Sequence, residues 1–191
     1  DAVYFGASAY NARMGAKNFG DEELADAIRL CRATGVKTNI TVNTLAYDRE
    51  LAGLIKTVER LYILGCDALI VADLGAAALI HKYFPDLTLH ASTQAAAHNL
   101  DAAEQLYKLG FSRMVAAREL SYQNLKLLCE RSPIETELFI HGAVCVSQSG
   151  QCLLSSMVGG RSGNRGECAQ PCRLCYSTPN DKKPKYALSL K

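Results

Sequence analysis

The sequence predicts an α/β fold in which parallel strands alternate with amphipathic helices. Short β-rich runs alternate with longer helical patterns along most of the 191 residues. The repeating unit is visible in residues 65–71 (GCDALIV) and 110–115 (GFSRMV), because each run ends a helix at glycine and begins a strand. Strand–helix alternation with short connections predicts parallel strands joined by right-handed crossovers.

Six strands and five helices are expected in alternating order. The strands are β-rich runs, expected at Ala2–Phe5, Lys37–Asn43, Ala68–Ala72, Thr88–Ala91, Arg113–Ala116 and Glu137–Ile140. The helices are amphipathic stretches, expected at Asp21–Thr34, Asp48–Leu64, Gly75–Tyr83, Asp101–Leu109 and Ser121–Arg131.

Short polar residues and glycines set the expected helix ends. Asp21, Asp48 and Ser121 are the expected N-caps, because a short side-chain oxygen satisfies the free amides of a first helical turn. The expected closing residues are glycines just before strands, where a left-handed backbone is needed: Gly35, Gly65 and Gly110.

A TIM-like (β/α) barrel, incomplete in this chain, is favoured over an open sheet. None of the units carries the G-x-G-x-x-G turn that is typical of dinucleotide-binding open sheets. Residues 1–5 (DAVYF) match only the second half of the repeating unit, so we expect the chain to begin within the fold. Residues 1–144 are then the barrel portion, and residues 145–191 are a cysteine- and glycine-rich segment continuous with it.

Polar side chains fall at the carboxyl ends of the expected strands, where (β/α) barrels gather their functional groups. Singly, each can serve as a helix cap or as a hydrogen-bonding loop residue. The expected substrate-binding residues are Asn43, Asp73, Gln94, Arg118, Glu137 and His141, and His90, Ser92 and Glu119 fall at the same ends. Together they predict a polar mouth suited to a hydrogen-bonding ligand.

Composition indicates a globular protein, with 49% hydrophobic and 21% charged residues. We find no apolar run of about 18 residues and no signal peptide at the start. We therefore expect no membrane span and a cytoplasmic location.

The net charge of +2 implies no partner by itself, but the end of the chain is basic. From residue 161 onward the basic residues are Arg161, Arg165, Arg173, Lys182, Lys183, Lys185 and Lys191, against Glu167 and Asp181. A basic patch attracts phosphate backbones, so RNA contact through Arg161–Lys185 is one expectation. An ordinary solvated loop is the other.

The eight cysteines are unevenly distributed. Cys31, Cys66 and Cys129 stand singly in apolar helical or strand patterns, and we expect them to be buried, unreactive thiols. The other five crowd into 31 residues: Cys145, Cys152, Cys168, Cys172 and Cys175, separated by six, fifteen, three and two residues. This asymmetry predicts a local site.

Thiolates bind soft metals and iron–sulfur clusters, and four of them complete the coordination of a cubane. Zinc sites usually combine two close cysteine pairs, whereas only the second half of this set is tightly spaced. Five glycines between residues 150 and 166 allow the backbone to curl around a bound group. On spacing alone, an iron–sulfur cluster, zinc, and disulfides or free thiols all remain open.

Residues 137–155 resemble the signature of the collagenase-like peptidase family, whose catalytic mechanism is unassigned. In pattern form they read E-x-F-x-x-G-A-V-C-x-x-x-x-G-x-C-x-L-S. Residues 160–166 (GRSGNRG), 168–173 (CAQPCR), 1–6 (DAVYFG) and 42–44 (VNT) resemble the same family. The resemblance spans essentially the whole chain, and a pattern of nineteen residues is highly specific.

The resemblance implies a [4Fe-4S] protein. Several relatives are bacterial proteins needed to hydroxylate transfer-RNA uridine, ribosomal-RNA cytidine or the ubiquinone ring, and these relatives carry such a cluster on cysteines. The resemblance implies that Cys145, Cys152 and Cys168 are three ligands. Cys172 is the expected fourth, while relatives that use a different residue leave Cys175 or a position beyond Lys191 as alternatives.

Three functional hypotheses follow. The preferred one is RNA base hydroxylation by an iron–sulfur protein, with prephenate as the cosubstrate that the resemblance implies. A peptidase is the second, although the sequence holds no H-E-x-x-H helix, no G-x-S-x-G elbow and no evident cysteine–histidine pair. The third is a non-catalytic accessory protein that delivers substrate to a hydroxylase, through a partner protein or further domains.

Overall fold

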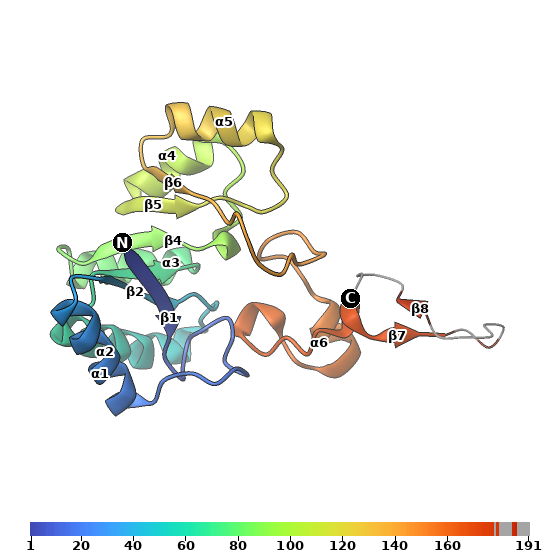
Figure 1. Ribbon diagram of the computed structural model, residues 1–191, viewed down its shortest axis with the longest axis horizontal. Helices are drawn as coiled ribbons and strands as arrows, with labels where there is room; N and C mark the ends of the chain where they lie inside the picture. Colours follow the sequence, from blue (N-terminus) through green and yellow to red (C-terminus); the bar gives the residue numbers. More distant parts are fainter. Residues whose placement is uncertain (178, 180–184, 187–191) are drawn as a thin grey trace.

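A six-stranded parallel sheet forms the body of the protein (Figure 1). The computed structural model describes residues 1–177, 179, 185 and 186. Strand order in the sheet equals chain order, and every neighbouring pair is parallel. The strands are β1 (Ala2–Gly6), β2 (Lys37–Val42), β3 (Ala68–Val71), β4 (Thr88–Ala91), β5 (Phe111–Val115) and β6 (Glu135–Glu137).

Five helices alternate with these strands, which confirms the predicted α/β fold. They are α1 (Asp21–Ala33), α2 (Asp48–Leu64), α3 (Leu74–Tyr83), α4 (Leu100–Lys108) and α5 (Tyr122–Arg131). The helices lie along the outer side of the sheet (Figure 1). In the described part of the chain, none is long and apolar enough to cross a membrane.

The sheet curls into an incomplete barrel. Its two edges are β1 and β6, so the described strands form an open sheet. The curl brings the ring of Tyr4 on β1 edge-on against the ring of Phe139, two residues after β6, with centroids 6.4 Å apart. The expectation of an incomplete barrel is confirmed at this level.

The hydrophobic core lies between the sheet and the helices. Ile40, Leu69 and Leu89 occupy one row of the parallel register, and each is fully buried. Successive strand residues point to opposite faces, so this row faces the helices. It packs with helical residues that include Leu24, Ile28, Leu54, Leu61 and Ile80. Full burial of each such side chain contributes about 1.5–3 kcal/mol, so this layer fixes the body of the fold.

Helix ends follow the prediction only in part. Ser121 caps α5, since its side chain accepts a hydrogen bond from the Asn124 N–H. The expectation that Asp21 and Asp48 are N-caps is wrong, because each is the first helical residue. In both helices a glutamate three residues after the cap accepts the cap's backbone N–H instead. The predicted closing glycines do adopt positive φ angles: Gly35, Gly65 and Gly110.

The last strand lies earlier than predicted. The expected strand Glu137–Ile140 is wrong, because β6 ends at Glu137. Its partner β5 ends at Val115, opposite Glu137, so the ladder has no partner residues to continue along. The Arg113 guanidinium on β5 pairs with carboxylates at both ends of β6, which stabilises this register. The residues after β6 leave the sheet, and Ile140 is 96% exposed.

Residues 145–177, here called the cysteine segment, contain short elements that the sequence did not indicate. They are α6 (Leu154–Gly159), the 3₁₀ turns η2 (Gly163–Arg165) and η3 (Pro171–Arg173), and the strand β7 (Cys175–Tyr176). Strand β7 pairs antiparallel with β8 (Lys185–Tyr186). Figure 1 shows the segment on the side toward which β4 and β5 point. The cysteine segment therefore lies beyond the carboxyl ends of these strands.

Candidate metal centre

The first contact between the cysteine segment and the body is made by Glu119, in the loop after β5. Both of its carboxylate oxygens accept hydrogen bonds from Ser149, one from the backbone N–H at 3.0 Å and one from the hydroxyl at 2.9 Å. Arg118 Nη2 lies 3.4 Å from the same hydroxyl. Ser149 is completely buried, and it lies between Cys145 and Cys152 in the chain. Glu119 thereby holds the loop that joins the first two candidate ligands.

A histidine completes this contact. His98 Nε2 lies 2.9 Å from Glu119 Oε1, and His98 Nδ1 lies 2.6 Å from the Ala96 carbonyl oxygen. The His98 ring therefore bridges the Ala96 carbonyl and the Glu119 carboxylate. Partial burial acts to raise the pKa of Glu119, but the hydrogen bonds from Ser149, its own backbone N–H and His98 outweigh it and lower the pKa to about 2. Glu119 is therefore a carboxylate at neutral pH.

A second contact joins the cysteine segment to the start of α2. Arg165 Nη1 and Nη2 donate to the two carboxylate oxygens of Glu50 at 3.0 and 2.6 Å, and Nη1 also donates to the Leu45 carbonyl oxygen at 2.8 Å. The guanidinium carbon lies 4.3 Å from the centroid of the Tyr47 ring. Hydrogen bonding from Arg165 lowers the pKa of Glu50. This bidentate pair fixes the turn just before Cys168.

Cys145, Cys152 and Cys168 lie within electrostatic range of Cys172, in the segment that these two contacts hold. Burial raises the pKa of the Cys172 thiol, and the negative charges of Cys145, Cys168 and Cys152 raise it further, against the opposing charge of Arg173. Charges shift a pKa in this way only at short range. A Cβ atom at Gly163 would lie 3.9 Å from the Cys152 carbonyl oxygen and 4.0 Å from Cys168 Sγ, so the two stretches meet at this glycine.

The surroundings of these thiols suit a soft-metal group. The Gln170 N–H lies 3.4 Å from Cys168 Sγ, which is the kind of hydrogen bond that tunes cluster sulfurs. The buried Ser155 hydroxyl accepts a hydrogen bond from the Ala169 N–H at 3.0 Å. This bond fixes the backbone between Cys168 and Gln170. Among the residues that the structure describes, no three His, Cys, Asp or Glu side chains are arranged to hold a single metal ion. The cluster therefore stays a prediction supported by its donor set.

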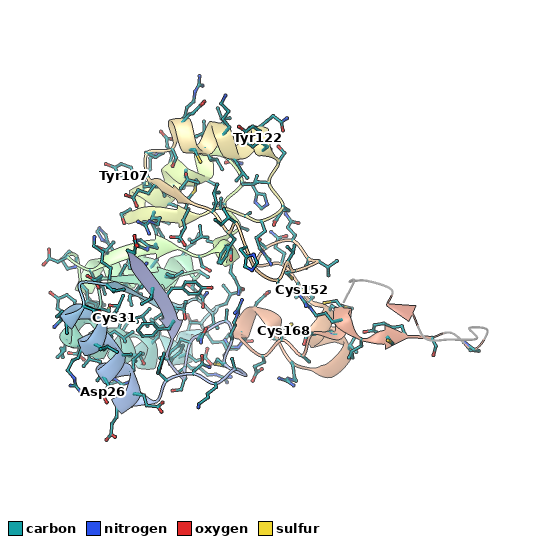
Figure 2. The ribbon with its side chains drawn as sticks, viewed as in Figure 1. Asp26, Cys31, Tyr107, Tyr122, Cys152 and Cys168 are labelled. Carbon is teal, nitrogen blue, oxygen red and sulfur yellow. The ribbon has the colours of Figure 1, made fainter. Side chains whose placement is uncertain are left out.

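The remaining cysteines separate from this group. Cys175 lies exposed on β7. Cys66 is buried, and burial raises its pKa to about 12, as expected of an unreactive thiol. The expectation of burial is wrong for Cys129, which α5 exposes to solvent, and Cys31 on α1 is only half-buried. Figure 2 shows Cys31 on the body, away from Cys152 and Cys168 in the cysteine segment.

Two residues of the predicted polar mouth hold the loops of the body together. Asn43 accepts the Ala12 N–H at 2.9 Å and donates to the Ser92 hydroxyl at 3.2 Å, which ties together loops after three strands. Asp73 is the N-cap of α3, accepting the N–H of Ala76 at 2.9 Å, and it also accepts the N–H of Ala46 at 3.0 Å. Both side chains thus have structural partners.

The other four predicted residues are dispersed. Gln94 lies on the 3₁₀ turn η1 (Thr93–Ala95), and its carbonyl oxygen packs against Gly150. Arg118 belongs to the Ser149 contact described above. Glu137 accepts a hydrogen bond from Arg113 at 3.1 Å, at the edge of the sheet, and His141 is exposed. The structure therefore brings Gln94 and Arg118 to the cysteine segment, whereas Glu137 is paired elsewhere.

The docking residues Glu50, Ser149 and Arg165 were not predicted from the sequence. Arg165 and Glu50 are 115 residues apart, and Ser149 and Glu119 are 30 apart. No local pattern pairs residues at such distances. The available signal was indirect, since Ser149 and Arg165 both fall inside the motif-bearing stretches around the cysteines.

Comparison with known sequences identifies related proteins. The family model described as Peptidase family U32 matches residues 1–191. The chain is 38% identical over 182 residues to a 23S rRNA 5-hydroxycytidine C2501 synthase of Escherichia coli (strain K12), covering 95% of this chain and 27% of that protein. It is 34% identical over 184 residues to tRNA hydroxylation protein P of the same organism, covering 96% of this chain and 41% of that one.

Another relative bears a protease name. The chain is 34% identical over 194 residues to a collagenase of Porphyromonas gingivalis (strain ATCC BAA-308 / W83), covering 95% of this chain and 46% of that protein. The chain thus spans less than half the length of each of these three relatives. The solved structure of a U32 peptidase matches with a TM-score of 0.62 at 18% identity, covering 72% of this chain and 60% of that one. At this identity the likeness shows the fold alone.

Proposed function

Because the chain belongs to peptidase family U32, we propose that it acts in the hydroxylation of RNA bases as an iron–sulfur protein. The observation that carries the proposal is the docking of the four-cysteine segment on loops at the carboxyl ends of the strands. In α/β barrels, active sites lie at this face. Relatives named for rRNA 5-hydroxycytidine synthesis and for tRNA hydroxylation support the substrate class.

The proposed cofactor is a [4Fe-4S] cluster held by Cys145, Cys152, Cys168 and Cys172. Four thiolates are the donor set that such a cluster requires, and zinc is the alternative occupant of the same donors. When bound, the cluster supplies one-electron redox chemistry. The residues of this chain hold the thiolates in place, and the Gln170 N–H donates to the sulfur of Cys168.

Fewer residues of the basic stretch Arg161–Lys185 are now proposed to contact RNA. Arg165 is committed to Glu50, so its charge is already paired inside the protein. Lys182 and Lys183 lie outside the described residues, as does the side chain of Lys185. Within the described part, exposed Arg161 and half-buried Arg173 are the cations of this stretch that can meet a phosphate. Prephenate as cosubstrate and the cytoplasm as location belong to the same proposal.

A peptidase is the second candidate, because one relative is named a collagenase. Its general base would be Glu137, and this carboxylate is hydrogen-bonded to Arg113 at 3.1 Å. This side chain is thus already committed to an ion pair at the edge of the sheet. Collagen cleavage that survives rigorous purification and is lost in Glu137→Gln would favour the peptidase.

Purification of the chain in complex with a hydroxylase, with no activity alone, would favour an accessory role.

Mass spectrometry of RNA nucleosides tests the preferred function. Transfer RNA and ribosomal RNA are digested from a strain that lacks the gene and from strains complemented with defined variants. We expect one hydroxylated nucleoside to disappear on deletion and to return with the wild type and with Cys129→Ala. It should not return with Cys152→Ala. An unchanged set of nucleosides in the deletion strain would overturn the proposal.

A further inference from the structure

We propose that Glu119 and Glu50 are positioning residues for the candidate cysteine ligands. Each carboxylate fixes its own cysteines independently of the other. Glu119 acts through Ser149 on the loop that carries Cys145 and Cys152, and Glu50 acts through Arg165 on the turn before Cys168. The role of this positioning in holding a cluster rests on the proposed function. The docking contacts themselves are properties of the polypeptide alone.

The contact through Glu119 pairs a buried serine with a partly exposed carboxylate. Ser149 has no exposed surface, so its hydroxyl and N–H require partners, and both find them on one carboxylate. The next residue is Gly150, with φ +70°, where a Cβ atom would lie 2.3 Å from the Gln94 carbonyl oxygen. The loop between Cys145 and Cys152 is therefore seated closely on the loops after β4 and β5.

The contact through Glu50 has a different partner surface. The bidentate Arg165–Glu50 pair is about one quarter exposed on each side chain, and the Tyr47 ring covers the guanidinium. Just after it, Gly166 has φ +83°, and a Cβ atom there would lie 2.2 Å from the Asn11 carbonyl oxygen. This turn is therefore seated on the loops after β1 and β2, two residues before Cys168.

The two contacts share no residue, which is why their effects should separate. They attach to loops from different strands. The stretches that carry Cys152 and Cys168 come together at Gly163. Apolar burial does not hold the segment in place, because many of its large hydrophobic side chains are exposed: Val146, Leu153, Met157, Val158 and Leu174. Substitutions at contacts without shared partners are usually additive. Each carboxylate should therefore control only its own cysteines.

Site-resolved alkylation of the metal-free chain tests the inference. The full chain is treated with iodoacetamide, and the rate at each cysteine is read by peptide mass spectrometry. We expect Glu119→Gln to raise the rates at Cys145 and Cys152 about tenfold, because it weakens the charge-assisted hydrogen bonds to Ser149, and to leave Cys168 within about twofold. Glu50→Gln should raise the rate at Cys168 about tenfold and leave the rates at Cys145 and Cys152 within about twofold.

Three controls accompany this experiment. Exposed Cys129 is the internal reference for reagent activity, and buried Cys66 reports unfolding of the body. Glu104→Gln is the matched variant, because this carboxylate lies on α4 and, among the described residues, makes only an exposed pair with Lys108. It should leave the rates at Cys145, Cys152 and Cys168 unchanged.

Two outcomes would overturn the inference: equal acceleration of all the thiols by either substitution, or acceleration by neither. If Cys66 reacts in Glu119→Gln, the body has opened, and Ser149→Ala decides instead because it removes only a hydroxyl. Ser149→Ala must then accelerate Cys145 and Cys152 selectively, and its failure to do so contradicts the inference.

A spectroscopic readout connects the positioning to the metal centre. After anaerobic reconstitution with iron and sulfide, the electron paramagnetic resonance spectrum of the reduced protein should shift in Glu119→Gln and Glu50→Gln. It should stay unchanged in Glu104→Gln. Unshifted spectra in both positioning variants would contradict a role at the centre. Because alkylation uses the metal-free chain, its result stands even if the nucleoside experiment rejects the proposed function.

Discussion

The sheet-and-helix body and the cysteine segment are held in place by different forces. The body buries a continuous apolar layer, in which Ile40, Leu69 and Leu89 are fully covered by helices. The cysteine segment exposes many of its large apolar side chains and is docked through Ser149 and Arg165. The body thus has its own source of stability, whereas the segment depends on a few polar contacts.

The largest expected effect is a cavity in the body. Leu69→Ala should lower the free energy of unfolding by about 2–5 kcal/mol, because it removes a fully buried side chain from the core layer. Met157→Ala on α6, where the side chain is 82% exposed, should change it by less than about 0.5 kcal/mol. Urea denaturation followed by circular dichroism measures both. Equal losses would show that the segment shares the core of the body.

The next effect is steric and local to the segment. Gly150→Ala should destabilise the docked loop by about 1–3 kcal/mol, since the residue has a positive φ and a Cβ atom would meet backbone. Gly159→Ala is the matched control, because that position has open space and no positive φ. Amide hydrogen exchange should show faster exchange around Ser149 in Gly150→Ala only, with the core strands unchanged. Similar exchange in both variants would refute the close seating.

A smaller effect is expected at Asp73, which the sequence suggested as a substrate-binding residue. Its side chain caps α3 and accepts the Ala46 N–H, so Asp73→Ala should cost about 1 kcal/mol of stability. Thermal unfolding measures the loss. A variant of unchanged stability that loses affinity for RNA would instead favour the original interpretation as a ligand contact.

The smallest effect is a pH dependence of docking. The pKa of Glu119 is lowered from 4.5 to about 2 in the folded protein, so its contribution is present in full above pH 4.5. It should fade as the pH falls from 4.5 through 2, where the carboxylate takes up a proton. The protection of the Ser149 amide in the wild type should therefore approach that of Glu119→Gln over this range, after correction for intrinsic exchange. A constant difference down to pH 2 would contradict the assignment.

The same contrast explains what could be predicted from the sequence. The alternating elements of the body follow from the periods of apolar residues, so Thr88–Ala91 was located without error and most other ends within two residues. The last strand was misplaced because its register depends on Arg113 pairing with Glu135 and Glu137, and Glu135 looks like a loop residue in sequence. Cys129 was misjudged because an apolar helical pattern does not say how far the edge of a helix is covered.

The sequence predicted which residues are the candidate ligands, but not how they are arranged in space. The cysteine motif singled out Cys145, Cys152, Cys168 and Cys172, and in the structure the segment that carries them is docked on the body through Ser149 and Arg165. The residues that hold this arrangement could not be found in the same way. Glu119–Ser149 and Glu50–Arg165 are pairings made by the fold, and they become visible only when the loops of the barrel are assembled.

Metal analysis of the anaerobically purified protein tests the central claim most directly. Iron, acid-labile sulfide and the visible spectrum are measured for the wild type, Cys172→Ala and Cys175→Ala. We predict a brown protein with about four iron and four sulfide per chain, strongly reduced in Cys172→Ala and retained in Cys175→Ala. A colourless protein that holds zinc in place of iron, or full iron content in Cys172→Ala, would contradict the assignment of these four thiols to a cluster.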